Sequence, residues 1–500
     1  MWPFSRPKVH PSSAPLLFTN TLSGKKEPFA PLKAGHATLY SCGPTVYSPQ
    51  HIGNMRAAVF ADVIARTLEE SGYRVRRVIN ITDVGHLLGD NEGDANQGED
   101  RMEKSARETG ERAEDIARRY TDRYLADIRA LNLDTEDVLF PRATAYIKEQ
   151  LALIQALEKK GHTYRIKDGI YFDTASFDGY GKLGGVPKEF LQEGTADSLG
   201  GRIAIAGHGR IKENTEKRHP ADFALWKFTA PGERRQQEWS SPWGRGFPGW
   251  HIECSAMGRA LLGETIDVHT GGMEHINVHH NNEIAQSEGA TGRQFVRYWM
   301  HLTHLTLGGE KFSKSTGNVI YLSDITGRGI HPLALRYLFL QAHYRTPLSF
   351  SWDALEAADG ALKRLWKQAS ELKQAAKGLI LPSASADRIT ALLRDDLGTP
   401  AALAALWETV KDDALPAKEA WGAILAADAV LGLSLTEPPV TASPTLSADE
   451  IPEDVRALIR EREAARQSRD FAKADEIRIH ITKRGYHVDD GPHGPVITRK

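Results

Sequence analysis

The sequence predicts an α/β fold, in which a parallel sheet is split by an insertion and followed by an α-helical bundle and a small C-terminal domain. Residues 37–42 form an apolar run that ends at a Gly-Pro pair, residues 55–71 repeat apolar side chains with helical period up to Gly72, and residues 74–81 are a second apolar run. A strand, a turn, a helix and a strand in succession form a βαβ unit, which favours a parallel sheet with ligands at the carboxyl ends of its strands. Four polar side chains fall at those ends: Cys42, His51, Thr82 and Asp83.

The remaining elements follow in order along the chain. Helical patterning returns over residues 107–160, residues 169–229 are strand-like and glycine-rich, and strand and helix signals resume over residues 250–307. Residues 332–433 are rich in alanine and leucine at helical spacing, and residues 437–447 have the composition of a linker. The expected domains are an N-terminal extension and edge segment (1–36), the first half of the sheet domain (37–164), a connective insertion (165–230), the second half of the sheet domain (231–305), a lysine-containing loop region (306–350), the helical bundle (351–436), a linker (437–450) and a C-terminal domain (451–500).

Composition excludes several classes of protein. Of 500 residues, 26% are charged and 41% are hydrophobic, and no apolar run approaches the roughly 18–20 residues that a membrane helix needs. The net charge of −2 excludes a uniformly basic nucleic-acid binder but allows one basic surface. Two cysteines without a disulfide framework indicate a reducing cytoplasm, and the basic residues before Glu27 are interpreted as an N-terminal extension and not as a targeting segment.

The segment His51-Ile-Gly53-Asn54 lies in the turn between the first strand and the first helix. A helix N-terminus presents free N–H groups and a partial positive charge to an anion, and a glycine allows a ligand to approach the backbone closely. Phosphate binding is therefore one interpretation. A polar turn without a ligand is the other, and four residues alone do not decide between them.

Two lysines and two hydroxyls occur together in Lys311-Phe-Ser313-Lys314-Ser315, between glycine-containing segments. A cationic loop of this kind suits the neutralisation of a triphosphate, because nucleotidyl transfer depends mainly on positioning and on stabilisation of developing negative charge. A solvated basic loop is the equally simple alternative.

A metal site is suggested by His279 and Glu283, which have the i, i+4 spacing that places two side chains on one face of a helix. Together with Cys42 and Cys254 they make four ligands of types that zinc accepts in tetrahedral geometry. The separations along the chain exclude a local zinc finger, so the fold would have to assemble the site. The alternative is a helix histidine and two buried cysteines without a metal.

All these motifs occur in one order along the chain. They are Cys42-Gly-Pro-Thr-Val-Tyr47, His51-Ile-Gly-Asn54, Asn80-Ile-Thr-Asp83, Gly249-Trp-His-Ile-Glu-Cys-Ser-Ala-Met257, His279-His280 with Asn282-Glu283-Ile-Ala-Gln286, and Lys311-Phe-Ser-Lys-Ser315. In this order they closely resemble the cysteinyl-tRNA synthetases, a family of class I aminoacyl-tRNA synthetases, over about residues 17–490. The resemblance implies a split Rossmann-like catalytic domain, ATP-dependent ligation of L-cysteine to tRNA(Cys) through a cysteinyl adenylate, and an anticodon-binding C-terminal domain.

The resemblance also assigns roles to individual residues. The residues that it makes catalytic are His51, Asn54, Lys311 and Lys314. The residues that it expects to bind ATP are His51, Gly53, Asn54, Lys311, Ser313, Lys314 and Ser315. The residues that it expects around the bound cysteine are Gly43, Thr45, Thr82, Trp250 and His269. The ligands that it implies for one zinc ion per chain are Cys42, Cys254, His279 and Glu283. Mg²⁺ would accompany ATP, and the enzyme is expected to be a cytoplasmic monomer.

Zinc would explain how the implied enzyme distinguishes cysteine from serine. A discrimination of 10⁴ corresponds to about 5.5 kcal/mol, which ordinary pocket contacts rarely supply for so small a difference. A thiol binds zinc strongly as its thiolate, whereas an alkyl hydroxyl is far harder to deprotonate. An editing domain would then be unnecessary, and the short insertion at residues 165–230 agrees with this.

Some positions depart from the usual pattern of the family. Phe312 replaces a common methionine, Thr270 interrupts a glycine run, and Asn281 replaces a common acid, but none of these removes an expected ligand. The C-terminal tail lacks an expected tryptophan, so the anticodon contacts stay open, as does the role of residues 86–104. Two alternatives remain: a related ligase that transfers cysteine to an amino sugar, and a zinc-dependent tRNA-binding protein without catalysis.

Overall fold

The computed structural model describes residues 14–86, 100–185, 215–307, 310–311, 319–439, 451–468, 470–491 and 494–499. The chain divides into two compact units, Met1–Thr436 and Glu437–Lys500. The division falls at the start of the segment whose composition is that of a linker. In the described part of the chain, no helix is both long and apolar enough to cross a membrane.

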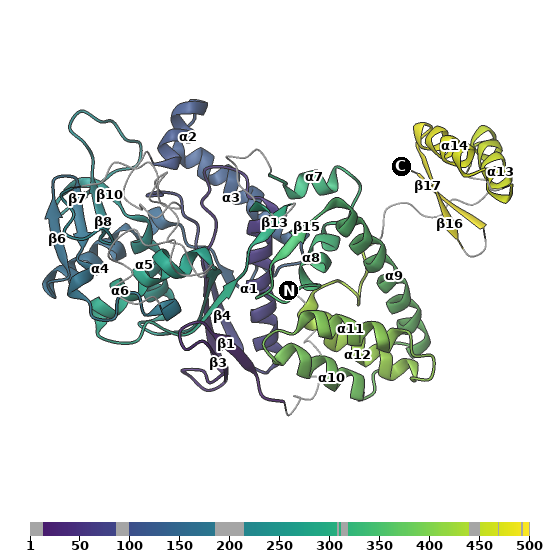
Figure 1. Ribbon diagram of the computed structural model, residues 1–500, viewed down its shortest axis with the longest axis horizontal. Coiled ribbons are helices and arrows are strands. Elements are labelled where there is room, and N and C mark those ends of the chain that lie inside the picture. The colour runs from purple at the N-terminus through teal and green to yellow at the C-terminus, as the bar shows by residue number, and fades with distance from the viewer. Residues whose placement is uncertain are drawn as a thin grey trace, which may run out of the picture. The chain divides into compact units, whose positions relative to one another are not determined.

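The first unit is built around a five-stranded parallel sheet, with the strand order β12-β11-β3-β4-β5 (Figure 1). Its strands are β3 (His36–Ser41), β4 (Arg74–Ile79), β5 (Val138–Leu139), β11 (Ile266–Gly272) and β12 (Val296–Leu302). The pairing of β3 with β11 joins segments that are far apart in sequence. The α/β fold expected from the sequence is confirmed, and all these strands present their carboxyl ends at one edge.

Helix α1 (Ile52–Glu70) connects β3 to β4 and completes the predicted βαβ unit. It begins at Ile52, before the residue 55 that apolar periodicity indicated. The reason is a capping box, in which the His51 ring accepts a hydrogen bond from the Gly53 N–H and the Asn54 side chain accepts one from the His51 N–H. Polar capping extends the helix past its apolar stretch.

A second sheet lies between the two halves of the parallel sheet in sequence, with the strand order β6-β7-β8-β10-β9 and antiparallel pairing. Its strands are β6 (Thr163–Ile166), β7 (Gly169–Phe172), β8 (Phe223–Phe228), β9 (Trp239–Ser241) and β10 (Gly244–Pro248). This sheet continues to Pro248, past the residue 230 at which the sequence placed the end of the insertion. The reason is long-range pairing, because β10 returns alongside β8 with Pro248 opposite Trp226.

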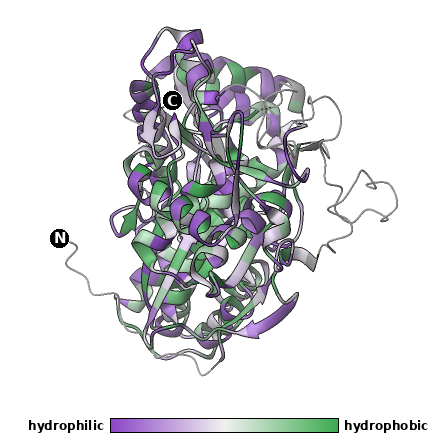
Figure 2. Ribbon diagram, turned by 90° about the vertical axis from the view of Figure 1, so that its left-hand side faces the viewer, coloured by the Kyte–Doolittle hydropathy of each residue, from purple (hydrophilic) through white to green (hydrophobic). Residues whose placement is uncertain are grey.

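Helices surround the sheets and form the bundle that follows them. Those within the sheet region are α2 (Arg101–Thr109), α3 (Ala113–Ala130), α4 (Ile147–Lys159), α5 (Trp250–Leu262) and α6 (Asn281–Thr291). Those beyond it are α7 (Leu322–Thr326), α8 (Pro332–Leu340), α9 (Trp352–Ala376), α10 (Ala384–Arg394), α11 (Thr399–Val410) and α12 (Ala417–Leu431). Hydrophobic and hydrophilic residues alternate along many of them (Figure 2), since these helices pack one face inward, whereas α8 is buried on nearly all sides.

Two small sheets complete the first unit. The hairpin β1 (Leu17–Asn20) and β2 (Lys25–Pro28) precedes β3. The three-stranded sheet β14-β13-β15 joins β13 (Leu305–Leu307) to β14 (Glu310–Lys311) and β15 (Leu348–Phe350). This sheet carries Lys311 and lies directly after the last strand of the parallel sheet.

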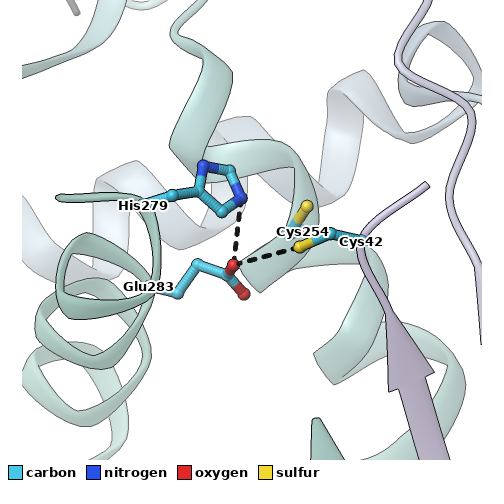
Figure 3. Close-up of side chains that lie close together, drawn as sticks. All are labelled: Cys42, Cys254, His279 and Glu283. Atoms are coloured by element: carbon cyan, nitrogen blue, oxygen red, sulfur yellow. Dashed lines mark hydrogen bonds and ion pairs between the residues drawn. The ribbon is translucent and has the colours of Figure 1, made fainter. Parts of the chain in front are cut away.

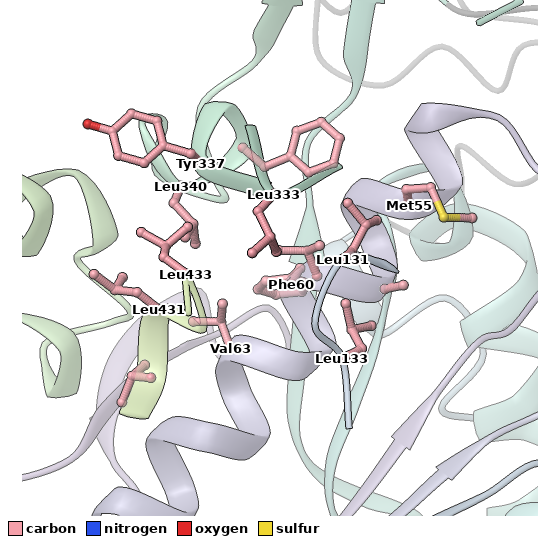
Figure 4. Close-up of a cluster of buried hydrophobic side chains, with 14 of the residues drawn as sticks. Met55, Phe60, Val63, Leu131, Leu133, Leu333, Tyr337, Leu340, Leu431 and Leu433 are labelled. Atoms are coloured by element: carbon pink, nitrogen blue, oxygen red, sulfur yellow. The ribbon is translucent and has the colours of Figure 1, made fainter. Parts of the chain in front are cut away.

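One continuous core connects α1 to the helical bundle (Figure 4). Phe60 and Val63 of α1 pack with Leu333 of α8 and with Leu431 of α12, and all four are buried. Each fully buried side chain of this kind contributes about 1.5–3 kcal/mol of transfer free energy. The helix that follows β3 is therefore anchored firmly on the bundle side.

The second unit has its own small core. Its elements are α13 (Glu453–Gln467), α14 (Phe471–Lys483), β16 (Tyr486–Gly491) and β17 (Gly494–Arg499). Val455, Ile481, Val488 and Ile497 are buried in it, so each of these helices and strands contributes at least one side chain. The helices and the β-like tail agree with the sequence expectation for this region.

Candidate functional site

Four side chains from distant segments converge beyond the carboxyl ends of the central strands (Figure 3). Cys42 follows β3, Cys254 lies in α5, His279 lies in a π-helical turn, and Glu283 lies in the first turn of α6. Their four donor atoms all lie within 4.8 Å of one another. The pairing of β3 with β11 makes this possible, since it brings the end of the first half of the sheet beside the second half.

The geometry of this cluster is that of a metal-binding site. His279 Nε2 lies 3.0 Å from Glu283 Oε1, and Cys42 Sγ lies 4.0 Å from the same oxygen. In a tetrahedral site with bonds of 2.0–2.3 Å, ligand atoms are about 3.3–3.8 Å apart, so these donors need only small movements to surround an ion. The two sulfurs, the imidazole and the carboxylate therefore fit a metal ion in both type and spacing.

The two cysteines have opposite electrostatic environments. A hydrogen bond with the Cys42 thiol lowers the pKa of Cys254 to about 6, although burial opposes this shift. Burial raises the pKa of the Cys42 thiol well above its ordinary value, and the hydrogen bond with Cys254 adds to the rise. The pair thus holds a thiolate and a thiol side by side, and a thiolate is the form in which cysteine binds metals.

Glu283 and His279 form a charged pair inside the protein. Burial alone would raise the pKa of Glu283, but His269 and His279 outweigh it and lower this pKa to about 2. Burial alone would lower the pKa of His279, yet hydrogen bonds with Cys254 and Glu283 raise it to about 10. In this form the protonated His279 neutralises the Glu283 carboxylate, and a metal ion bound by both residues would take the place of that proton.

A second set of four donors overlaps the first. It contains Cys42, His269, His280 and Glu283, again with donor atoms within 4.8 Å of one another. His269 Nε2 lies 3.0 Å from Glu283 Oε2, and His280 Nε2 lies 3.3 Å from Cys42 Sγ. His269 was expected beside the substrate, and the structure places it in contact with an expected metal ligand.

Several histidines around the cluster were not singled out by the sequence. His251 Nδ1 lies 2.8 Å from His279 Nδ1, and His280 Nδ1 lies 2.7 Å from His301 Nε2. His251 stands within a motif that the sequence did single out, and His301 lies near the carboxyl end of β12. The position of His301 at a strand end was the signal that could have identified it.

Trp250 lies between two imidazole rings beside the cluster. Its ring stacks on His86 with centroids 4.4 Å apart and 5° between the planes, and its centroid lies 4.4 Å from that of His279. His86 Nδ1 in turn lies 2.7 Å from Thr45 Oγ1. Trp250, Thr45 and the metal cluster, all predicted from the sequence, are thus linked through a histidine whose role the sequence left open.

Asn80 connects two further residues expected at the substrate. Its side-chain carbonyl accepts a hydrogen bond from the Gly43 N–H at 2.8 Å, and its amide donates to Thr82 Oγ1 at 3.1 Å. A Cβ at Gly43 would lie 1.7 Å from the backbone carbonyl oxygen of Asn80, so only glycine allows this approach. The ends of β3 and β4 are held together by these contacts.

The expected ATP-binding residues lie in two places. His51, Gly53 and Asn54 form the N-terminus of α1, whose first turn contains no acidic residue. Lys311 lies in strand β14. Three further expected residues lie outside the described part of the chain: Ser313, Lys314 and Ser315.

Two family models match the chain. That of the tRNA synthetases class I (C) catalytic domain matches residues 28–360, and that of the cysteinyl-tRNA ligase anticodon binding domain matches residues 448–494. Similar proteins include cysteine–tRNA ligase 1 of Burkholderia lata, which is 46% identical over 488 residues with 96% of each chain covered. The cysteine–tRNA ligase of Chlorobaculum tepidum is 41% identical over 500 residues, which cover 96% of this chain and 98% of that one.

Solved structures show the same fold at low sequence identity. Mycobacterium tuberculosis methionyl-tRNA synthetase bound by methionyl-adenylate superposes with a TM-score of 0.52 at 14% identity, covering 81% of this chain and 92% of that one. The Agrobacterium radiobacter K84 agnB2 LeuRS-tRNA-LeuAMS complex gives a TM-score of 0.57 at 12% identity, covering 82% and 85%.

Proposed function

The chain belongs to the cysteine–tRNA ligase family of class I aminoacyl-tRNA synthetases, which ligate L-cysteine to tRNA(Cys) with ATP. We propose here the residues that bind the metal, the cysteine and the ATP in this reaction. The convergence of Cys42, Cys254, His279 and Glu283 carries the proposal. These four residues hold one zinc ion, which when bound offers the substrate thiol a soft Lewis acid. The set with two sulfurs is preferred over the overlapping one because thiolates bind zinc most strongly.

The residues beside the metal ligands bind the amino and carboxyl groups of the substrate cysteine. Trp250 and Thr45 are held by His86, and Thr82 and Gly43 are held by Asn80, so their positions are fixed before the substrate arrives. His269 contacts the Glu283 carboxylate and orients it. Fixed polar groups of this kind align the cysteine carboxylate without any movement at the moment of reaction.

ATP binds across the N-terminus of α1 and the loop that begins at Lys311. The positive end of the α1 dipole, with His51 and Asn54, faces the phosphates, while Lys311 and Lys314 neutralise the leaving pyrophosphate together with Mg²⁺. The substrate carboxylate is itself the nucleophile that attacks the α-phosphorus. The site therefore needs alignment and charge stabilisation, with no covalent enzyme group.

The second unit recognises the tRNA. Its residues match the anticodon-binding family model, and this match disfavours an amino sugar as the acceptor. The cysteines are both free, which agrees with a reducing cytoplasm, and the chain acts there as a monomer.

Zinc content tests the proposed ligand set directly. We expect Cys254→Ser and His279→Gln to lose most of the roughly one equivalent of zinc in the purified protein, since each removes one of four ligands. His280→Gln is the matched control and should retain zinc, because His280 belongs only to the overlapping set. Metal analysis of dialysed protein gives the answer. Zinc retained in Cys254→Ser but lost in His280→Gln would replace the proposed set with the overlapping one.

A further inference from the structure

Helix α1 holds both ends of the segment that carries Lys311. The Ile52 N–H donates to the Ile320 carbonyl at 3.0 Å. One turn later, Arg56 Nη1 donates to the Thr303 and His304 carbonyls at 2.8 and 2.9 Å. Helix α1 therefore binds the chain on both sides of β13 and β14, through a backbone N–H at its start and through a side chain one turn later.

A third hydrogen bond connects Arg56 to the neighbouring strand. Arg56 Nη2 donates to the Thr346 carbonyl at 3.1 Å, just before β15. Strand β15 runs parallel to β13, and β14 pairs with β13 so that Lys311 lies opposite Thr306. The guanidinium therefore fixes the starts of two adjacent strands, β13 and β15 (Figure 1), and the sheet that they form with β14 carries Lys311.

Arg56 is a buried cation, which is an unusual choice for a position that needs only to be filled by a side chain. Its side chain is 2% exposed, and among the described residues no carboxylate forms an ion pair with it. Burial lowers the pKa of Arg56 to about 10. Burying a cation without a counterion is costly, and methionine would fill a similar volume without that cost. Only the planar guanidinium of arginine has enough N–H donors in fixed directions to bind three carbonyls on two segments at once.

We propose that Arg56 is a positioning residue for adenylate formation, which sets the strand that carries Lys311 relative to His51 and Asn54 at the start of α1. The inference rests on the ATP-binding roles proposed for these residues. Arg56 acts through the backbone of β13 and β15. Since a displacement of about 1 Å can cost roughly 10²-fold in rate, the three hydrogen bonds affect catalysis as well as stability.

The first test is Arg56→Lys, which keeps the positive charge but removes the planar guanidinium and its several N–H donors. We expect kcat of cysteine-dependent ATP–pyrophosphate exchange to fall roughly 10- to 100-fold. The KM for cysteine and the zinc content should not change, because the cysteine site lies on other strands. Arg336→Lys is the control: Arg336 is also fully buried, donates to the Leu431 and Leu131 carbonyls and pairs with Asp62, and these partners lie outside the sheet that carries Lys311, so this substitution should lower Tm and leave kcat unchanged. Arg56→Lys with a lowered Tm and an unchanged kcat would overturn the proposal.

The second test combines Arg56→Lys with Lys311→Met in a double-mutant cycle. If Arg56 acts by placing Lys311, its replacement should cost less than about 3-fold once Lys311 is gone, so the two losses are not additive. Additive losses would overturn the role of Arg56 alone. Full exchange activity in the single variant Lys311→Met would instead overturn the ATP-binding role of Lys311.

Discussion

Asn54 caps a helix, and the ATP-binding role that we propose for it would use the same side chain. Its side-chain oxygen accepts the His51 N–H at 3.1 Å and thereby closes the capping box of α1. The same position was predicted from the sequence to bind ATP. Helix capping needs only a hydrogen-bond acceptor at this position, whether neutral or negatively charged. Phosphate binding needs a side chain without negative charge, so a substitution that adds a charge separates the two roles.

Asn54→Asp makes that separation. Aspartate caps helices as well as asparagine does and is favourable in the first turn, so the free energy of unfolding should change by less than about 0.5 kcal/mol or rise. The new carboxylate should repel the triphosphate and raise the KM for ATP by roughly 10-fold or more, equivalent to about 1.4 kcal/mol. Urea unfolding and ATP-dependent exchange measure the two effects. An unchanged KM for ATP would contradict the placement of the phosphates at this helix.

At the scale of elements, Asp62 connects α1 to a helix of the bundle and to the central sheet. Its carboxylate lies 2.7 Å from Arg66 Nε, 3.3 Å from Arg77 Nη1 in β4 and 2.7 Å from Arg336 Nη2 in α8. Burial would raise the pKa of Asp62, but these three guanidiniums outweigh it and hold the pKa well below its ordinary value. One carboxylate thus pairs with guanidiniums from α1, β4 and α8. Removing it leaves these buried cations without the negative charge that balances them.

Asp62→Asn should therefore lower the free energy of unfolding by about 3–5 kcal/mol at pH 7. Because the folded-state pKa is depressed, this contribution is present above the unfolded value of about 3.9 and is lost as pH falls through the folded-state value. Urea titrations of wild type and variant should converge as the solution is acidified below about pH 4. The control is Asp395→Asn, which removes an exposed pair with Lys26 and should cost less than about 1 kcal/mol. A difference that persists unchanged at low pH would contradict the assignment.

For the whole molecule, the division into two units has a functional consequence. Each unit has its own buried core, so the first unit should fold without the second. The residues proposed for the metal, cysteine and ATP all lie in the first unit, while the residues that match the anticodon-binding model lie in the second.

A chain that ends after Thr436 should accordingly form the adenylate but charge tRNA poorly. We expect cysteine-dependent exchange within about 3-fold of the full chain, and kcat/KM for tRNA(Cys) lower by roughly 10-fold or more, which is at least about 1.4 kcal/mol of lost binding. Pyrophosphate exchange and aminoacylation of a transcript measure these. The two activities falling together would show that the second unit supports the catalytic unit as well as the tRNA.

Much of the fold was predictable because its signals are local. The apolar runs on either side of a helix predicted β3, α1 and β4, and helical spacing in 332–433 predicted the bundle. The extension of the second sheet past residue 230 was not predictable, since β10 belongs to this sheet only through its pairing with β8. Such pairing joins residues whose local sequence does not specify a partner.

The sequence by itself determined the family and the reaction, because the motifs and their order are read directly along the chain, and it predicted the chemical types of the site residues. Only the tertiary structure decided that Cys42 lies close to Cys254, because the pairing of β3 with β11 brings the two halves of the sheet together. It also decided that His269 and His280 belong to an overlapping set of metal donors. It alone also showed what Arg56 binds. Its acceptors are backbone carbonyls, which every residue has, so no pattern of side chains could have predicted them.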